Sequence, residues 1–312
     1  MSDRPVALVI GTYDPDFPRN RQMVRLLESH GWDVRTLPIP LWGSSRVDEA
    51  SGSRVVVGLR LVLAMLRVVL AAVTAPRPDL MITLHPGQFD AAVVAPIARL
   101  RGIPLVTDHF ISLHETVVAD RGLASEGSAA GRLLRWFDRR AIRTAALVVA
   151  DTPEDAAHFA ADAAVDPERF VVAWVGADPA LYAPTEAEPE LDLVLFYGTY
   201  ISLHGCETIV EAAATLRGRG IRVRMLGDGQ ERAEIEALAR RLGDPVEFVP
   251  PVPEEELRDH IGAAAVCLGV FSTGPKASRV VPNKVFQCLS VGRPVVTGAT
   301  PAVERALGDA VV

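Results

Sequence analysis

Short apolar runs alternate with longer segments of helical periodicity along the 312-residue chain. In the first half, the apolar runs predict strands at residues 6–10, 33–36, 80–84, 105–107, 147–150 and 171–175. The segments between them repeat apolar residues at the helical spacing over residues 19–30, 55–74, 88–101, 130–144 and 153–163. This alternation predicts an α/β fold with a parallel, doubly wound sheet.

The same alternation begins again after a polar interruption. Residues 177–190 are rich in Pro, Glu and Ala and lack an apolar period, which is typical of a linker between domains. Beyond it the pattern predicts strands at 191–197, 222–226, 246–249, 266–270 and 295–297 and helices at 207–217, 230–242, 254–264 and 282–291. We therefore expect two domains, at residues 1–176 and 191–312, joined by the linker.

The end of the chain interrupts this pattern. Residues 310–312 are apolar and predict one more strand, with no helix after it. Because connections in doubly wound sheets normally return through a helix, we expect the second domain to be incomplete at its C-terminus. The alternative is a domain that is naturally short.

The predicted helix at residues 55–74 is as long as a bilayer-spanning helix. It contains Arg60 and Arg67, each of which would cost about 3 kcal/mol at the bilayer centre, so we expect it not to span a membrane. Seven residues apart, the two arginines share one face of the helix. This pattern predicts a helix packed against a sheet, with a helix lying on a membrane surface as the alternative.

Composition narrows the class of protein. Hydrophobic residues make up 49% of the chain, and the formal charge is −7 with a predicted pI near 5.6, which argues against general binding of nucleic acid. Its first residues lack the apolar core of a signal peptide, so we expect a cytoplasmic protein. The cysteines have no metal-ligand spacing and resemble small apolar residues, so no metal site is expected; they are Cys206, Cys267 and Cys288.

The strongest chemical signal is a basic loop that leads into a short helix. Pro282 is a residue that favours the first turn of a helix, and Arg279 and Lys284 flank that turn. Backbone N–H groups at a helix N-terminus, the positive end of the helix dipole and two cationic side chains together suit a multiply charged anion such as a diphosphate.

Two glycine-rich turns follow the first two strands of the second half. Gly198 and Gly205 bracket the first turn, and Gly227 and Gly229 lie in the second. Backbone can approach a phosphate or a sugar closely at such turns, although glycine is also the ordinary residue of a tight turn. We expect both turns and the basic loop to meet at one edge of the sheet. The chain contains neither a Walker A sequence nor a complete G-x-G-x-x-G fingerprint, which argues against a P-loop NTPase or a nicotinamide dehydrogenase.

These motifs and their order resemble the GT-B glycosyltransferases, in particular the retaining group 1 family (glycosyltransferase family 4). The resemblance covers almost the whole chain. In the second half it rests on Gly198-Thr199-Tyr200, His204-Gly205, Leu226-Gly227-Asp228-Gly229, Pro282-Asn283-Lys284-Val285-Phe286-Gln287 and Gly292-Arg293-Pro294-Val295-Val296. In the first half it rests on Gly11-Thr12-Tyr13, His30-Gly31-Trp32-Asp33-Val34 and Gly176-Ala177-Asp178.

The resemblance implies two Rossmann-like domains with a nucleotide-diphosphate sugar in the cleft between them. Lys284 and Arg279 would neutralise the diphosphate leaving group, without a metal or another cofactor. The residues implied in donor binding are Gly198, Thr199, Tyr200, His204, Gly205, Gly227, Gly229, Arg279, Asn283, Lys284 and Gln287.

The chain departs from the family pattern at three donor positions. Many relatives carry two glutamates eight positions apart, where this chain has Arg279 and Gln287, and a lysine where it has His204. The Gln287 amide can still bind ribose hydroxyls, without the charge of a carboxylate. His204 could donate to phosphate only when it is protonated.

The first domain supplies candidates for the chemical step. Asp108 follows a buried strand, where the resemblance implies a residue near the reacting sugar, and His109, His114 and Glu115 are alternatives. An Asp that caps the next helix is an equally good interpretation of Asp108. Residues expected on the acceptor side are Asp14, Arg19, Asn20, Ser112 and His114.

The leading hypothesis is therefore a glycosyltransferase that moves a sugar from a nucleotide-diphosphate donor to an acceptor hydroxyl. The acceptor is unknown, and we expect it to be lipid-linked or membrane-associated if residues 55–74 lie on the inner face of a membrane. A nucleotide-sugar epimerase or hydrolase on the same fold is the first alternative, because fold does not determine function. A non-catalytic nucleotide-sugar-binding protein is the second, suggested by Arg279 and Gln287.

Overall fold

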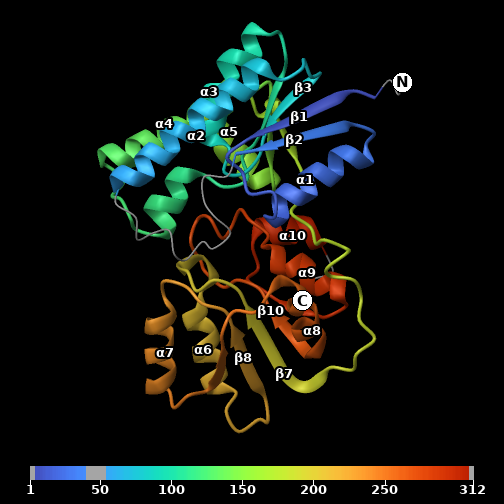
Figure 1. The fold of residues 1–312 in the computed structure, drawn as a ribbon. Coiled ribbons are helices and arrows are strands. Elements are labelled where there is room, and N and C mark those ends of the chain that lie inside the picture. The colour runs from blue at the N-terminus through green and yellow to red at the C-terminus, as the bar shows by residue number, and fades with distance from the viewer. Residues whose placement is uncertain (1–3, 40–53, 309–312) are drawn as a thin grey trace. The chain divides into compact units, whose positions relative to one another are not determined.

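The computed structural model describes residues 4–39 and 54–308, with no side-chain description for Arg54, Val55 and Val57. The chain divides into two compact units, the first ending at Ala173 and the second beginning at Trp174 (Figure 1). Each unit has a parallel sheet and hydrophobic cores of its own.

The first unit contains a six-stranded parallel sheet in the order β2-β1-β3-β4-β5-β6. The prediction of a doubly wound parallel sheet is confirmed. The strands are β1 (Val6–Gly11), β2 (Asp33–Pro38), β3 (Leu80–Thr83), β4 (Leu105–Asp108), β5 (Leu147–Ala150) and β6 (Phe170–Val172). The helices are α1 (Pro18–Ser29), α2 (Arg54–Thr74), α3 (Gln88–Leu100), the π-helical turn η2 (Glu115–Asp120), α4 (Ala129–Thr144), α5 (Pro153–Ala163) and the 3₁₀ turn η3 (Pro167–Arg169).

Helices cover both faces of this sheet. Met23 of α1 packs into a core with Ala7 and Val9 on one face. Helices α2, α3 and α4 share the core of the other face, to which α2 contributes Val68 and Ala72. The interpretation of α2 as a helix packed on a sheet is therefore confirmed for that side of the helix. In the described part of the chain, no helix combines the length and the hydropathy needed to cross a bilayer.

The second unit contains a five-stranded parallel sheet in the order β11-β10-β7-β8-β9. Its strands are β7 (Glu190–Tyr197), β8 (Arg222–Leu226), β9 (Val246–Val249), β10 (Ala264–Leu268) and β11 (Val295–Val296). Its helices are η4 (Ser202–His204), α6 (Cys206–Thr215), α7 (Arg232–Arg241), α8 (Glu254–Ala263), α9 (Asn283–Val291) and α10 (Pro301–Leu307).

Two local features of the second unit differ from the sequence pattern, and one prediction falls outside the described residues. Residues 177–190, where the sequence predicts a linker, include Tyr182, which is buried in the core with Leu195 and Cys288. Helix α10 was not expected; its signals are Thr300, whose hydroxyl accepts from the Val303 N–H, and Pro301 in the first turn. The strand predicted at residues 310–312 lies outside the described residues.

The strand order reverses once in each sheet. In the first unit, the chain runs outward from β1 to β2 and then returns to β3 on the other side of β1. In the second unit, it runs from β7 through β8 to β9 and returns to β10 beside β7. Loops that leave adjacent strands in opposite directions leave a crevice at the carboxyl ends of those strands, where open α/β sheets bind ligands. The candidate sites are therefore the loops after β7 and β10, and those after β1 and β3.

Candidate functional site

Two glycine turns are stacked at the carboxyl edge of the second sheet. A Cβ atom on Gly227 would lie 2.0 Å from the carbonyl oxygen of Gly198, and one on Gly229 would lie 2.4 Å from the Tyr200 nitrogen. The Tyr200 N–H donates to the Asp228 carbonyl at 2.9 Å, which fixes the two turns to each other. The glycines at 227 and 229 are therefore required by loop packing, because a side chain at either position would push the turns apart.

The loop after β10 joins the same edge. The Phe271 N–H donates to the His204 carbonyl at 3.1 Å, and a Cβ atom on Gly205 would lie 2.8 Å from the Phe271 carbonyl carbon. Gly205 has a φ of 62°, which favours glycine. The prediction that three loops meet at one edge of the sheet is confirmed.

Lys284 lies at the centre of this edge, in the first turn of α9. Its side chain is buried, and its Nζ lies 4.1 Å from the ring centroid of Phe196 and would lie 3.0 Å from a Cβ atom on Gly198. Within the described residues, Nζ has no hydrogen-bond partner. Burial lowers the pKa of Lys284 to about 7. A buried amine without a protein partner, at a helix N-terminus and beside a bare glycine, is suited to an anionic ligand.

Gln287, one turn after Lys284 in α9, is held by the last residue of strand β7. The Tyr197 hydroxyl donates to Oε1 of Gln287 at 2.8 Å, and both side chains are buried. Burial raises the pKa of Tyr197 well above its ordinary value, so this hydroxyl keeps its proton. The Tyr197 hydroxyl uses one of the two lone pairs of that oxygen, and the amide N–H groups of Gln287 are left to bind a ribose hydroxyl.

His204 does not provide the cationic phosphate contact that a protonated ring would make. Burial, and then the nearby charge of Lys284, lower the pKa of His204 to about 3, so the ring is neutral at pH 7. Its Nδ1 lies within hydrogen-bond distance of the Thr199 carbonyl, which selects the tautomer with a proton on Nδ1. Nε2 is then an acceptor, and it would donate to a phosphate only after taking up a proton.

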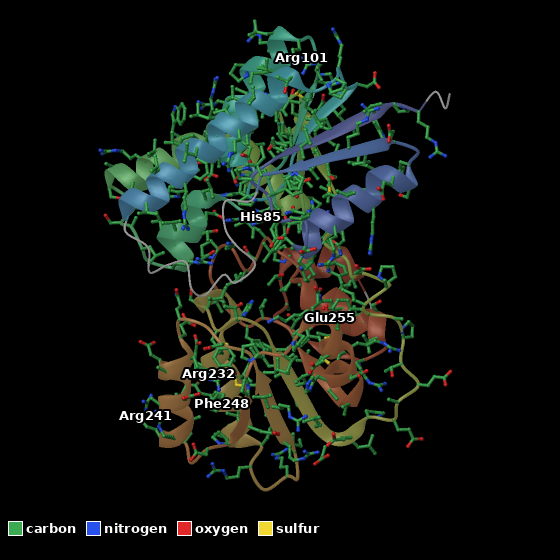
Figure 2. The ribbon with its side chains drawn as sticks, viewed as in Figure 1. His85, Arg101, Arg232, Arg241, Phe248 and Glu255 are labelled. Atoms are coloured by element: carbon green, nitrogen blue, oxygen red, sulfur yellow. The ribbon has the colours of Figure 1, made fainter. Side chains whose placement is uncertain are left out.

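Tyr200, one of the residues implied in donor binding, has its side chain in the core. It is fully buried, and its hydroxyl donates to the Met225 carbonyl at 2.9 Å. The Arg232 guanidinium lies over the rings of Tyr200 and Phe248, at 5.2 Å and 5.1 Å from their centroids (Figure 2). Arg232 also donates to the Gly227 carbonyl, so this stack holds the two glycine turns.

The remaining donor candidates border the same edge. Thr199 is exposed on the first glycine turn, and Asn283 is half-buried at the start of α9. Arg279 is half-buried in the loop before α9, where its N–H donates to the Lys276 carbonyl at 3.0 Å. The loop thus holds both lysines of the chain, Lys276 and Lys284.

In the first unit, the loop after β1 is tied to α3 by a buried carboxyl group. Asp90 accepts from the Thr12 N–H at 2.9 Å and from its hydroxyl at 3.1 Å. A Cβ atom on Gly11 would lie 2.5 Å from the Asp90 carboxyl, so glycine is required there. Burial raises the pKa of Asp90 to about 7, partly offset by the two bonds from Thr12.

Asp108, which was expected near the reacting sugar, is part of a buried ion pair. Its two oxygens accept from Nη2 and Nε of Arg19 at 2.9 Å and 3.1 Å, and both side chains are buried. Arg19 also donates to the Ala173 carbonyl at 2.5 Å and lies 5.5 Å from the Phe110 ring centroid. Both carboxylate oxygens are therefore committed to one guanidinium, in a bidentate, charge-assisted pair. Asp108 and Arg19 instead fix the loop ends around them.

His109 keeps its ring nitrogens available. The ring is buried edge-on against Phe159, with the centroids 4.6 Å apart, and neither nitrogen has a hydrogen-bond partner in the described part of the chain. Burial lowers its pKa, against the opposing charges of carboxylates such as Asp138 and Asp108, so it is neutral at pH 7. Of the two candidates for the chemical step, His109 is the one with free hydrogen-bonding capacity.

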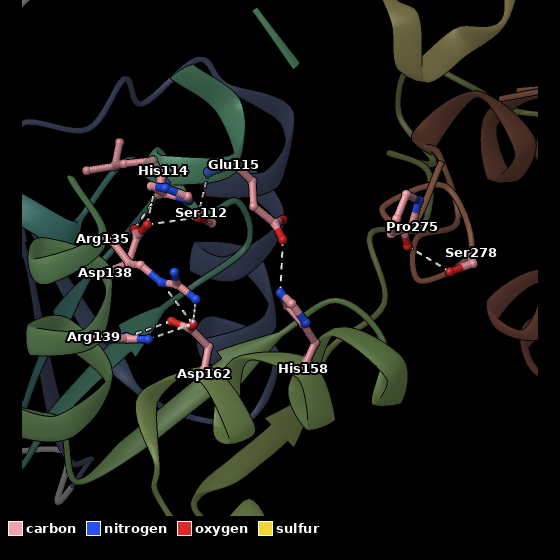
Figure 3. Close-up of polar contacts among 11 residues, drawn as sticks. Ser112, His114, Glu115, Arg135, Asp138, Arg139, His158, Asp162, Pro275 and Ser278 are labelled. Atoms are coloured by element: carbon pink, nitrogen blue, oxygen red, sulfur yellow. Dashed lines mark hydrogen bonds and ion pairs between the residues drawn. The ribbon is translucent and has the colours of Figure 1, made fainter. Parts of the chain in front are cut away.

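The loop after His109 is organised by Asp138 of α4 (Figure 3). Asp138 accepts from the Ser112 hydroxyl at 2.8 Å and from the backbone N–H groups of Leu113 and His114 at 3.0 Å and 2.9 Å. Ser112 in turn accepts from the Glu115 N–H at 3.0 Å. The Ser112 hydroxyl and the His114 N–H therefore hold the loop, and only the half-buried His114 ring is left to contact an acceptor.

Asp14 and Asn20 hold the loop after β1 in a similar way. The side-chain amide of Asn20 donates to the Asp14 carbonyl at 2.9 Å and to the His85 carbonyl at 2.8 Å. These bonds connect the loop after β1 to the loop after β3 at the switch point. Oδ1 of Asn20 is buried and has no hydrogen-bond partner among residues 4–39 and 54–308.

Comparison with known families agrees with this geometry. Residues 8–176 match the glycosyl transferase 4-like domain, and residues 192–311 match glycosyl transferases group 1. The chain belongs to the group 1 glycosyltransferase family.

Two curated proteins show how far the match extends. Alpha-D-kanosaminyltransferase of Streptomyces kanamyceticus is 26% identical over 232 residues, which is 68% of this chain and 57% of that protein. D-inositol 3-phosphate glycosyltransferase of Pseudarthrobacter chlorophenolicus is 27% identical over 229 residues, 68% of this chain and 52% of that protein. The matches thus span little more than half the length of these relatives.

Solved structures establish the GT-B fold. Sucrose-phosphate synthase of Thermosynechococcus elongatus has a TM-score of 0.71 at 18% identity, covering 97% of this chain and 83% of that one. HepE of Anabaena in complex with UDP has a TM-score of 0.62 at 17% identity, covering 96% and 82%. The predicted fold of two Rossmann-like domains is confirmed.

Several residues that build the glycosyltransferase site were missed by sequence reasoning. Tyr197 and Phe196 end strand β7 beneath Gln287 and Lys284, and Asp90 and Asp138 anchor loops from helices. Arg232, at the start of α7, locks the glycine turns. A polar residue on the buried face of a helix, as at Asp90 and Asp138, was the available signal, because such a group must find a partner.

Proposed function

We propose that this protein is a metal-independent, retaining glycosyltransferase that moves a sugar from a nucleotide-diphosphate donor to an acceptor hydroxyl. The observation that carries the proposal is the buried Lys284 amine, which has no hydrogen-bond partner in the described residues and lies beside Gly198 at the start of α9. A structure of the same fold, HepE of Anabaena, holds UDP, so UDP is the first diphosphate to test.

The charge that leaves with the nucleotide would be stabilised by groups of the second unit. Protonated Lys284, the first-turn N–H groups of α9 and Arg279 of the preceding loop are the candidate contacts. These groups supply positive charge without a divalent ion, and the amide of Gln287 is left to bind the ribose. Activity that persists in excess EDTA would support metal independence, and loss that Mg²⁺ or Mn²⁺ restores would contradict it.

For the first unit, we assign the contact with the reacting groups to His109. The ion pair with Arg19 makes Asp108 a positioning residue, whereas both ring nitrogens of His109 lack a protein partner among the described residues. A neutral imidazole can accept a proton from a hydroxyl or donate a hydrogen bond to the transferred sugar. His109→Ala should lower turnover by about 10²–10⁴ with little change in donor affinity.

A donor-binding protein without transferase activity is the second candidate. It is favoured by Arg279 and Gln287, which stand where many relatives carry glutamates, and by the bound oxygen of Gln287. A binding protein of this kind would bind a nucleotide sugar as a transferase does. It would not transfer the sugar, so it would release no nucleotide.

One assay separates the two functions. Nucleotide release from UDP-, GDP- and ADP-sugars is measured with a panel of hydroxyl acceptors, with wild type, Lys284→Ala and His109→Ala. Acceptor-dependent release that both substitutions reduce supports the transferase, and NMR of the product's anomeric proton determines retention or inversion. Donor binding with no release for any acceptor would favour the binding protein, and binding of none of the donors would overturn both.

A further inference from the structure

Helix α2 carries two apolar faces, of which residues 4–39 and 54–308 cover one. The first, formed by Ala64, Val68 and Ala72, is buried against the sheet of the first unit. On the opposite side of the helix, six leucines and valines are between 46% and 63% exposed: Leu59, Val62, Leu63, Leu66, Leu70 and Val73. Large apolar side chains exposed in a continuous row are unusual on a soluble surface and indicate an interaction site.

The exposed side chains form one stripe. At 3.6 residues per turn they fall within an arc of about 100°, and from Leu59 to Val73 the stripe is about 21 Å long. The buried residues Val68 and Ala72 lie on the far side of the same helical wheel. A surface helix that packs one face on a protein core normally has a polar outward face, and α2 does not.

Positive charge lies directly beside the stripe. Arg60 and Arg67 are exposed and project beside one edge of it, about 90–110° from its centre. Helix α2 contains no acidic residue. An apolar stripe flanked by arginines matches the chemistry of a bilayer with anionic headgroups, into which the apolar side chains insert while the guanidinium groups contact phosphate.

The neighbouring helices continue this pattern. Helices α2, α3 and α4 share a core on one face of the sheet, so their outer sides face the same way (Figure 1). On α4, Leu133 and Trp136 are 54% and 53% exposed, and tryptophan favours the interface between lipid and water. The sequences of the three helices contain nine arginines but only two acidic residues, Asp90 and Asp138, and both of these are buried. The exposed charge of this helix layer is therefore positive, although the whole chain carries −7.

We propose that the outer surface of α2, with Trp136 and Leu133 of α4, docks on an anionic lipid bilayer. The helix lies in the interface with its stripe among the acyl chains, and Arg60 and Arg67 bind the headgroups. This function is independent of the donor site in the second unit. It places the glycosyltransferase at a surface where a lipid-linked acceptor would be presented.

Vesicle binding tests the proposal. Wild-type protein should sediment with vesicles of phosphatidylcholine and phosphatidylglycerol in equal parts, less at high salt, and little with phosphatidylcholine alone. Arg60→Gln with Arg67→Gln should weaken binding to the anionic vesicles by about 30-fold, from about 1 kcal/mol for each arginine. Leu63→Glu with Leu66→Glu should remove it.

Matched control variants substitute the same types of exposed side chain at positions outside α2. Arg219→Gln with Arg241→Gln removes two exposed arginines of the second unit, and Leu26→Glu with Leu191→Glu alters two exposed leucines away from α2. Both control variants should bind the vesicles as wild type does. Thermal unfolding and nucleotide affinity should be unchanged in all four variants, which separates failure of membrane docking from failure of the donor site.

Tryptophan fluorescence gives a second measurement. Vesicles should shift the emission of wild type to shorter wavelength, and the shift should be lost in Trp136→Phe. Equal binding of wild type and the Leu63/Leu66 variant would overturn the proposal. A wild-type dimer that this variant dissociates, with no vesicle binding, would also overturn it and would assign the stripe to a second copy of the chain.

Discussion

At the residue scale, the site depends on polar groups that the fold buries at a cost. Lys284 is held without a hydrogen-bond partner among the described residues, and burial lowers its pKa to about 7 from 10.5. Asp108 and Arg19 form a buried ion pair, although they are 89 positions apart in the sequence. In the proposed function the first group gains its partner from the diphosphate, whereas the second pair is already satisfied. This difference separates a binding residue from a positioning residue.

Lys284→Met should stabilise the ligand-free protein. Between pH 7 and 10.5, the unfolded chain binds more protons at Lys284 than the folded one, so the wild-type contribution to stability rises with pH across that window. At pH 7 we expect the variant to have a free energy of unfolding about 1–3 kcal/mol higher, and the gap to narrow toward pH 10. Urea unfolding at both pH values measures it. A less stable variant at pH 7 would mean that the amine has a partner in the folded protein.

Asp108→Asn should act through stability. Removing one charge of a buried pair leaves the other uncompensated, at a cost of about 3–5 kcal/mol. Asp162→Asn is the matched control, because Asp162 pairs with Arg135 and Arg139 at a partly exposed position and should therefore cost clearly less than Asp108→Asn (Figure 3). Thermal unfolding compares them. If Asp108→Asn is as stable as wild type but loses turnover with an altered pH profile, Asp108 takes part in the reaction directly.

At the element scale, the loops at the strand ends determine the site. The sequence predicted the strands and helices of both units to within a few residues, because apolar periodicity and glycine turns are local signals. It also placed the three loops of the second unit at one edge, which follows from parallel topology. It did not reveal that Tyr200 is a core residue or that the Tyr197 hydroxyl donates to Gln287. The hydrogen-bond partners of these tyrosines are 25 and 90 positions away in the sequence, respectively. Helix α10 was too short for a periodic signal.

Gly227→Ala tests the stacking of the two glycine turns. The added methyl group would lie 2.0 Å from the Gly198 carbonyl at a φ of 137°, so we expect a loss of more than about 3 kcal/mol, with loss of nucleotide binding. Gly218→Ala is the control, because its φ is also positive, at 81°, with nothing within 4 Å of the added atom. It should cost about 1 kcal/mol. Equal effects in urea unfolding would mean that only backbone strain matters at Gly227.

At the scale of the whole molecule, the two units carry different kinds of surface. The second unit has the buried amine at its sheet edge, and the first has the apolar, arginine-flanked helix layer. The sequence indicated both features, through Lys284 after Pro282 and through Arg60 and Arg67 within an apolar helix. It could not show which side of α2 the sheet covers, because periodicity does not reveal this for a helix that is apolar on both sides.

Hydrogen exchange should separate these surfaces. UDP should slow amide exchange in the second unit, at residues 198–205 and 269–287, and leave α2 unchanged. Anionic vesicles should protect α2 and leave the glycine turns unchanged. Mass spectrometry of peptides from both units measures the two effects in one protein. If UDP protected amides of the first unit only, the nucleotide would bind there and not at the second sheet. That result would contradict the account.

The central claim is that Lys284 is an amine kept ready for a diphosphate, and the chain allows a direct measurement because it contains only two lysines. Reductive ¹³C-methylation labels the two lysines and the N-terminal amine. NMR titration then follows the lysine signals, which Lys284→Met and Lys276→Met distinguish from the N-terminal signal, with Lys276 as the internal reference. We predict that one signal titrates near pH 7 in the free protein and shifts by more than about one pH unit upward when UDP, GDP or ADP binds, because the anion favours the charged amine. Two signals that both titrate near 10.5 and respond to none of the three nucleotides would contradict the account.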